Sequence, residues 1–150
     1  MSTRLPNTAA RAAPENLAIL LREPFRTMSA ELHARLDAAG HGAVRPAHGA
    51  VMQFLDDDGT RVTALAERAQ MTKQSMAELV LHLERLGYVQ RVPDPSDRRA
   101  KLVRATPRGG QLYAIAREVV AELEAEWTRR LGKAKMRQLR ALLEELNAAL

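Results

Sequence analysis

The 150-residue chain contains no cysteine, few aromatic residues (3%) and no long hydrophobic run. The absence of cysteine excludes disulfides, thiolate metal sites and redox sensing through a thiol. No stretch approaches the roughly 18 consecutive apolar residues of a membrane-spanning helix. Residues 1–16 lack the apolar core of a secretory signal. We therefore expect a cytoplasmic protein without membrane association, with a flexible, mildly basic arm over residues 1–14.

The sequence patterns of common enzyme sites are also missing. There is no glycine-rich phosphate loop and no nucleophile elbow. The four histidines show no i, i+4 pair, and no cysteine accompanies them, so their spacing predicts no zinc site. We therefore expect no enzymatic activity, no cofactor and no metal, although histidines can still meet through the fold.

The residues that are abundant favour a helical globular protein. Alanine, leucine and arginine are common, 46% of residues are hydrophobic and 27% are charged. The formal net charge of +5 fits a partner such as nucleic acid or an anionic surface, but charge alone does not distinguish them. The length favours one compact domain, over residues 15–150.

Apolar residues recur at helical spacing near both ends of the chain. Residues 17–36 carry one such stripe, and Pro24 is expected to kink or restart that helix because an interior proline removes a hydrogen bond. Residues 107–130 predict a helix roughly 35 Å long at 1.5 Å per residue. Residues 133–150 carry a third stripe. We expect the terminal helices to pack on a second copy of the chain. The alternative is that they fold back on the first helix of the same copy.

The middle of the chain predicts a helix-turn-helix. One helix opens at residues 45–48 and ends at residues 56–59. A short strand is expected at residues 61–62, and Thr63 is expected to cap a short helix. The next helix follows the turn at residues 69–72. Its apolar face consists of Met76, Leu79, Val80, Leu83 and Leu86. Two helices joined by a short turn indicate a helix-turn-helix whose second helix reads DNA.

A β-hairpin is predicted directly after this helix. Two β-prone runs, residues 88–92 and 101–105, flank an acidic and basic turn at residues 94–99. Arginines on a narrow hairpin suit the negative potential of a DNA minor groove. The alternative is a solvated turn closed by an Asp–Arg salt bridge. Thr106 as N-cap and Pro107 at the first helical position predict that the next helix starts there.

The order of these elements and the segment LAERAQMTKQSMAELVLHLERLGYVQRVPDPSDRRAKLVRATPRG resemble the MarR family of bacterial winged helix-turn-helix transcription regulators. The resemblance covers about residues 15–150 and is strongest over residues 62–110. It implies a mainly helical fold with a small β wing. Residues 15–40 and 107–150 would be dimerisation helices, and residues 45–106 would be the DNA-binding lobe.

The resemblance also implies a function. The chain would form a homodimeric repressor that binds a palindromic operator in double-stranded DNA. It would be released by a small effector, aromatic or anionic in character, and Pro24 would reshape the cleft that holds such ligands in the family. The alternative is an architectural or activating DNA-binding protein without an effector. A third reading, an interaction module that has lost DNA binding, is disfavoured by the basic wing.

The predicted base contacts lie in the first turn of the helix that follows the turn at residues 69–72. Thr72 caps this helix, and Lys73, Gln74 and Ser75 would meet base edges in the major groove. Glutamine can read adenine and lysine can donate to guanine. Glu78, one turn further on, matches a family position that often touches DNA; the alternative is a solvated helix position.

The predicted wing contacts follow from the resemblance. Asp97 would orient Arg99, which would enter the minor groove, while Arg98 and Lys101 would reach phosphates. Further phosphate candidates are Arg45, His48, Arg104 and Arg108. Phosphate contacts supply much of the affinity of such proteins and little of their sequence choice.

Overall fold

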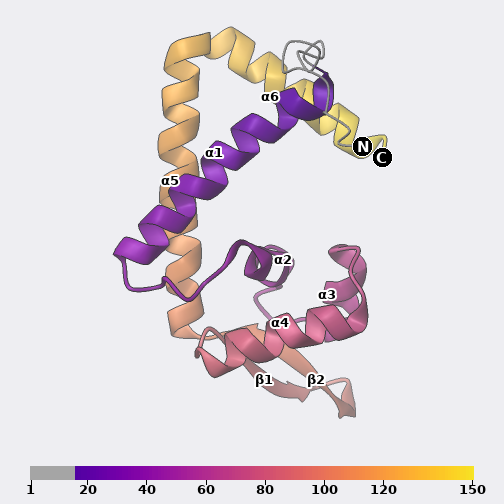
Figure 1. Ribbon diagram of the computed structural model, residues 1–150. Coiled ribbons are helices and arrows are strands. Elements are labelled where there is room, and N and C mark those ends of the chain that lie inside the picture. The colour runs from indigo at the N-terminus through magenta and orange to yellow at the C-terminus, as the bar shows by residue number, and fades with distance from the viewer. Residues whose placement is uncertain (1–15) are drawn as a thin grey trace, which may run out of the picture.

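The computed structural model describes residues 16–150, so the predicted arm at residues 1–14 lies outside the described residues. The elements in chain order are α1 (Leu17–Ala38), η2 (Pro46–His48), α2 (Gly49–Met52), α3 (Val62–Arg68), α4 (Lys73–Arg85), β1 (Val89–Asp94), β2 (Asp97–Ala105), α5 (Pro107–Leu131) and α6 (Lys133–Ala148). In Figure 1 the terminal helices α1, α5 and α6 form an open frame, and α2, α3, α4 and the two strands form a lobe at one end of α5. The predicted mainly helical fold with a small β wing is confirmed.

Helix α1 runs through Pro24 without a break, so the expectation of a restarted helix is wrong. Proline removes only its own N–H bond, and interactions on both sides of it are retained. The Glu23 carboxylate accepts from Arg26 Nη2 at 2.9 Å, and the Glu23 carbonyl accepts from Thr27 Oγ1 at 3.0 Å. The Asn16 side chain caps the helix by accepting from the backbone N–H of Ile19 at 3.1 Å. None of the helices in residues 16–150 is long and apolar enough to cross a membrane.

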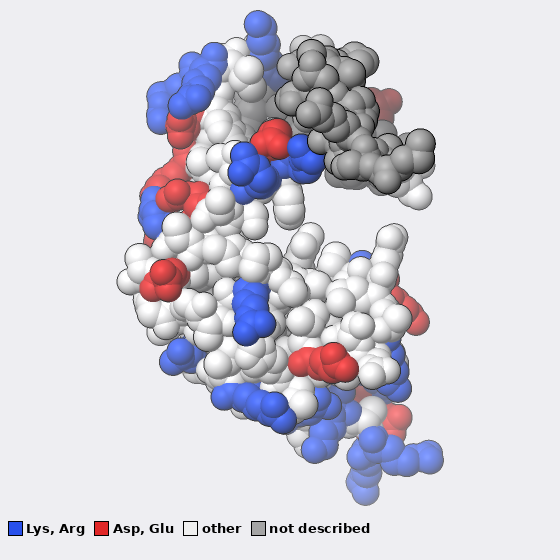
Figure 2. Space-filling model, viewed as in Figure 1, with Lys and Arg blue, Asp and Glu red and all other residues white. Residues whose placement is uncertain are grey.

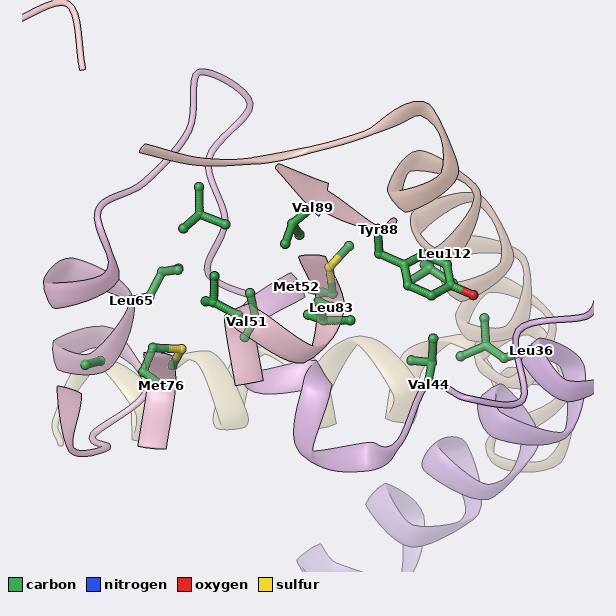
Figure 3. Close-up of a cluster of buried hydrophobic side chains, with 13 residues drawn as sticks. Leu36, Val44, Val51, Met52, Leu65, Met76, Leu83, Tyr88, Val89 and Leu112 are labelled. Carbon is green, nitrogen blue, oxygen red and sulfur yellow. The ribbon is translucent and has the colours of Figure 1, made fainter. Parts of the chain in front are cut away.

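The hydrophobic core lies inside the lobe and extends to the adjoining end of α5. Figure 3 shows side chains from α2, α3, α4, β1 and α5 meeting in this cluster. In α4, Met76, Val80 and Leu83 are fully buried, while Leu79 and Leu86 are partly buried at its edge. Each fully buried side chain of this size contributes about 1.5–3 kcal/mol. The apolar face predicted for α4 is therefore confirmed, and it holds the helix with its polar face outward.

The second helical segment is shorter than predicted. It consists of the 3-10 turn η2 and the single-turn helix α2, which ends at Met52 instead of continuing to residue 55. Two side chains donate hydrogen bonds to backbone carbonyls that would accept from the main chain in a longer helix. Tyr113 Oη donates to the Met52 carbonyl at 2.6 Å, and Arg68 Nη1 donates to the Phe54 carbonyl at 2.8 Å.

The strand expected at residues 61–62 is wrong. The contact with β2 is a single bridge one residue earlier, in which Thr60 and Val103 exchange backbone hydrogen bonds of 2.8 and 2.9 Å. Gly59, with φ of 99°, turns the chain so that only Thr60 runs beside β2. Arg61 is then the N-cap of α3, and Thr63 lies inside that helix instead of capping it.

The hairpin turn is tighter than predicted. The strands extend to Asp94 and Asp97, which pair with each other, so the connection consists only of residues 95–96. Asp94 Oδ1 accepts from the backbone N–H of Ser96 at 2.8 Å and from its hydroxyl at 2.7 Å, which closes the turn locally. Arg98 and Arg99 therefore lie in β2 and not in the turn itself.

Helix α5 begins where predicted and packs closely on the lobe. Thr106 Oγ1 accepts from the Gly109 N–H at 3.1 Å and donates to the Gly87 carbonyl at 2.6 Å. A Cβ atom at position 109 would lie 2.2 Å from the Tyr88 carbonyl oxygen, a distance that a folded chain cannot hold. The contact between α5 and the lobe therefore requires glycine at this position.

Gly109→Ala should destabilise the fold by roughly 1–3 kcal/mol, the usual cost of forcing extra volume into a packed site. Gly110→Ala is the matched control in the same turn, because within residues 16–150 no atom lies within 4 Å of its added Cβ. The control should be neutral or stabilising by up to about 1 kcal/mol, since alanine is the better helix former. Urea unfolding of both variants measures the difference, and equal effects would contradict this account of the α5 contact.

Candidate nucleic-acid interface

The first turn of α4 presents the predicted base-reading side chains. Thr72 caps α4 by accepting the Ser75 N–H at 3.1 Å, as predicted. Lys73, Gln74 and Ser75 are exposed beside it, and Glu78 is exposed one turn later. Together these side chains form one polar edge of the lobe.

Four of these five side chains lie in two intramolecular pairs. The Thr72 hydroxyl donates to Ser75 Oγ at 2.9 Å. Gln74 Nε2 lies 3.5 Å from Glu78 Oε1, at the limit of a hydrogen bond. Glu78 can therefore orient the Gln74 amide or compete with a base for it.

The turn between α3 and α4 contains no glycine, and Gln70 takes the conformation that glycine often supplies. Its φ of 52° is the only positive value among the non-glycine residues that the structure describes. An L side chain in this region carries a cost of roughly 1–2 kcal/mol. The turn is nevertheless held by the Met71 N–H, which donates to the Ala66 carbonyl at 2.9 Å. The sharp angle between α3 and α4, which leaves the start of α4 exposed, depends on this turn.

The wing carries a row of exposed basic side chains. Arg98, Arg99, Lys101 and Arg104 all lie on β2 and are exposed. Figure 2 shows Lys and Arg side chains gathered along the lower edge of the molecule, the edge that holds α4 and the wing in Figure 1. The arrangement suits a polyanion that runs along this edge of the lobe.

Asp97 does not hold Arg99 in the predicted way. Its Oδ1 accepts the backbone N–H of Arg99 at 3.0 Å, and its Oδ2 lies 3.9 Å from Arg61 Nη2. The expected hydrogen bond between the Asp97 carboxylate and the Arg99 guanidinium is therefore wrong. Asp97 holds the main chain at Arg99, and the Arg99 side chain is exposed to an external partner.

A second ion pair, which the sequence reasoning missed, fastens the wing to α3. Arg61 donates to Asp94 Oδ2 from Nε at 2.7 Å and from Nη2 at 2.5 Å. The Asp94 side chain is only 6% exposed. Hydrogen bonds from the Ser96 hydroxyl and backbone, and then Arg61, lower the pKa of Asp94 to about 2. The Asp-Pro-Ser turn was a local signal for Asp94, but no local pattern connects it to Arg61, 33 residues earlier.

The other predicted phosphate contacts differ in whether their side chains already bond within the chain. Arg45 is exposed at the N-cap of η2. Arg104 Nε donates to the Asp57 carbonyl at 3.2 Å. The Arg108 guanidinium lies 4.7 Å from the centre of the Tyr88 ring, and its Nη2 donates to Tyr88 Oη at 3.2 Å. Arg104 and Arg108 thus have structural roles in addition to their charge.

His48 is not a phosphate contact, and that prediction is wrong for this structure. The residue is 1% exposed, and both ring nitrogens have partners within the chain. Burial, followed by the charges of His82, Arg45 and His33, lowers the pKa of His48. The fold does bring His48 and His82 together, but residues 16–150 hold no group of three or more histidines and carboxylates able to bind a metal.

Comparison with known proteins identifies the lobe. Residues 44–100, which include the helix-turn-helix and the hairpin up to residue 100, match the model of the MarR family. The DNA-binding lobe of this chain is therefore of the MarR type. Transcriptional regulator HosA of Escherichia coli O111:H- is 31% identical over 88 residues, which are 59% of this chain and 65% of the relative.

Solved structures share the fold over most of the chain. The transcriptional regulator Tm0710 from Thermotoga maritima has a TM-score of 0.61 and 28% identity, and the match covers 87% of this chain and 90% of that one. The S. aureus MepR–DNA complex gives a TM-score of 0.69 at 21% identity, with 90% and 98% coverage. At that identity the likeness to MepR is one of fold. Both matches extend well beyond residues 44–100, so the likeness in fold to these two structures includes terminal helices of this chain.

The chain also has an open groove between α1 and α5, with a volume of about 490 Å³. Its lining combines the acidic side chains of Glu31, Glu122 and Glu126 and the basic Arg129 with apolar surface that includes Leu123 and Ala125. Arg35 of α1 bonds to Glu122 of α5 across it. Three carboxylates against one guanidinium make this lining unfavourable for an anion.

Asp94→Asn should lower stability at neutral pH, because the amide can still close the Ser96 turn but leaves Arg61 without a carboxylate. The pKa of Asp94 is lower in the folded chain than in the unfolded chain. Its contribution is therefore present above about pH 4 and is lost as pH falls from there toward 2. The stability difference between wild type and variant should consequently shrink below about pH 4.

Chemical unfolding from pH 7 down to pH 3 measures this difference. Asp58→Asn, at an exposed position in the loop before α3, is the charge-matched control and should change stability little. A constant difference between wild type and Asp94→Asn across the series would contradict a role for the Asp94 charge.

Proposed function

We propose that this chain is a homodimeric MarR-family transcription regulator of the cytoplasm that binds a palindromic operator as a repressor. The single observation that carries the proposal is the shared edge of the lobe, which holds the exposed start of α4 and the basic strand β2, with the wing fastened to the start of α3 through Arg61 and Asp94. A helix and a flanking hairpin so placed can contact a major groove and the adjacent minor groove at once. The fold shared with MepR, whose structure is of a DNA complex, supports this geometry.

In the proposed complex, Lys73, Gln74 and Ser75 meet base edges in the major groove, and Thr72 and Glu78 hold the reading end of α4 in position. Arg99 enters the minor groove, where narrow A·T-rich DNA has its most negative potential. Arg98, Lys101 and Arg45 contact phosphates. The division follows the general rule that phosphate contacts position a protein and base contacts select the sequence.

Dimerisation follows from apolar surface that one copy leaves exposed. In α6 the side chains of Leu139, Leu142 and Leu146 are 43%, 56% and 39% exposed and lie on one stripe. In α1, Leu17, Leu20, Leu21 and Phe25 are 42–73% exposed. Apolar patches of this kind mark interaction surfaces.

A two-fold dimer through these helices accounts for a palindromic site. Residues 15–40 and 107–150 would form the dimer, leaving residues 45–106 of each copy as a DNA-binding lobe. The two lobes would then meet half-sites about one helical turn, roughly 34–36 Å, apart.

Release by an aromatic or anionic effector rests on the family resemblance, and the acidic side chains of the groove between α1 and α5 disfavour an anion there. An architectural or activating role without an effector is the alternative. Mapping the genomic binding sites and testing compounds for release of the protein from the recovered operator separates the two. No enzymatic activity belongs to either reading.

Gln74→Ala should weaken binding to the recovered operator by about 1–3 kcal/mol and leave binding to random DNA almost unchanged. Gln138→Ala on α6, outside the lobe, is the matched control and should bind both DNAs normally. Fluorescence anisotropy at fixed salt measures the four affinities. Equal losses on operator and random DNA would show that Gln74 does not read bases.

Leu142→Glu should shift the chain from dimer to monomer, because it places a charge in the exposed apolar stripe of α6. Ala141→Glu adds the same charge on the neighbouring face of the helix, away from the stripe, and should leave the dimer intact. Sedimentation at micromolar concentration measures both. A wild-type chain that is a well-folded monomer would contradict the dimer outright.

A further inference from the structure

Two histidines far apart in the sequence join η2 to α4. His48 Nε2 lies 2.8 Å from His82 Nδ1, with the ring centres 4.8 Å apart. His48 is 1% exposed at the end of η2, and His82 is half-buried on the inner part of α4. The pair is a direct polar link between η2 and the helix proposed to read DNA.

The hydrogen bonds determine where the protons are. The backbone N–H of Arg45 donates to His48 Nδ1 at 2.8 Å, so that nitrogen must be the acceptor. The proton of neutral His48 is therefore on Nε2, which donates to His82 Nδ1. His82 in turn must keep Nδ1 unprotonated. Each of the three ring nitrogens, His48 Nδ1, His48 Nε2 and His82 Nδ1, has a suitable hydrogen-bond partner only when both rings are neutral.

One additional proton on either ring breaks this arrangement. On His82 Nδ1 it would place two N–H groups against each other at 2.8 Å, and on His48 Nδ1 it would face the Arg45 N–H. The charged and titratable groups that act on His48 are His82 of α4, Arg45 at the start of η2 and His33 of α1, and each opposes a positive charge there. Burial opposes it further.

We propose that His48 and His82 are positioning residues that form a proton-sensitive latch, seating α4 for DNA when both rings are neutral and loosening it when the pair takes up a proton. The effect on DNA rests on the proposed function, whereas the latch is a property of the folded chain alone. The proposal runs against simple electrostatics, since added protons should by themselves strengthen the attraction of phosphates. Operator affinity should instead fall as the solution becomes acidic.

The direction of the stability change follows from the same groups. The pKa of His48 is lower in the folded chain, so the unfolded chain takes up the proton first. Stability is therefore highest above about pH 6.5, the ordinary histidine value, and decreases as pH falls below it.

Amide hydrogen exchange in α4 tests the latch without DNA. Between pH 7.5 and 5.5 the wild-type protection factors, corrected for intrinsic exchange, should fall severalfold, because the unfolded chain takes up the proton before the folded chain does. His82→Asn should flatten this response, because the asparagine oxygen can accept from His48 Nε2 but takes up no proton. His48→Gln is a second variant that removes the buried titratable ring. His33→Gln removes the smallest of the charges that act on His48 and leaves the pair intact, so it should keep most of the wild-type response.

The contrary results are equally specific. Wild-type protection that is unchanged by pH, or His82→Asn and His48→Gln variants that both respond like wild type, would overturn the latch. So would imidazole nitrogen NMR showing the His48 proton on Nδ1 at pH 7.5.

A second experiment compares operator affinity at pH 7.5 and 5.5. At pH 5.5 His82→Asn should bind the operator more tightly than wild type, by about the factor by which the wild-type protection falls. Equal affinities at both pH values would overturn the coupling to DNA. A chain that shows the exchange response but binds no DNA sequence-specifically would support the latch and contradict the proposed function.

Discussion

The ion pair between Arg61 and Asp94 is the constraint on which the proposed DNA surface depends. A two-stranded hairpin is marginally stable in water, so the wing needs support from the lobe. Asp94 closes the hairpin turn and Arg61 caps α3, so one carboxylate connects the two elements. The Thr60–Val103 bridge and the buried side chains of Val89 and Val103 add to this support. The wing and the helix-turn-helix therefore act as one unit, with Arg99 held at a defined place relative to α4.

The same lobe is fastened to the frame by a second polar cluster around Tyr88. Its buried hydroxyl bonds to His41 Nδ1 at 2.8 Å and to Arg108, whose guanidinium also stacks on the ring. Gly109 allows α5 to approach the Tyr88 carbonyl. The angle between lobe and frame is thus set by close packing and hydrogen bonds. In a dimer that angle would determine the separation of the two reading helices, and hence the spacing of the half-sites.

Much of this arrangement could be predicted from the sequence because its signals are local. The Thr72 and Thr106 caps, Pro107 and the apolar face from Met76 to Leu86 each act within one helix, and all are found in the structure. The family resemblance supplied the order of the elements and the roles assigned to the exposed residues of α4 and β2. Those roles remain predictions, because exposure alone does not show what a side chain binds.

The predictions that failed depended on contacts between distant residues. The burial of His48 comes from His82, 34 residues away, and Arg61 meets Asp94 across 33 residues. Helix α2 ends early because Tyr113, from α5, takes the Met52 carbonyl. The Asp97 carboxylate accepts from the backbone N–H of Arg99 and not from its guanidinium. Spacing in the sequence cannot distinguish such partners, since several basic residues compete for each carboxylate.

The salt dependence of operator binding by Arg99→Ala tests the central claim that the wing is part of the DNA surface. If Arg99 lies in the minor groove, the variant should bind the operator more weakly than wild type. Its plot of log affinity against log salt should be shallower by about one unit, while the dimer stays intact. Arg130→Ala, on α5 outside the lobe, should match wild type. An Arg99→Ala variant with wild-type affinity and salt slope would contradict the claim and reduce the wing to an ordinary surface hairpin.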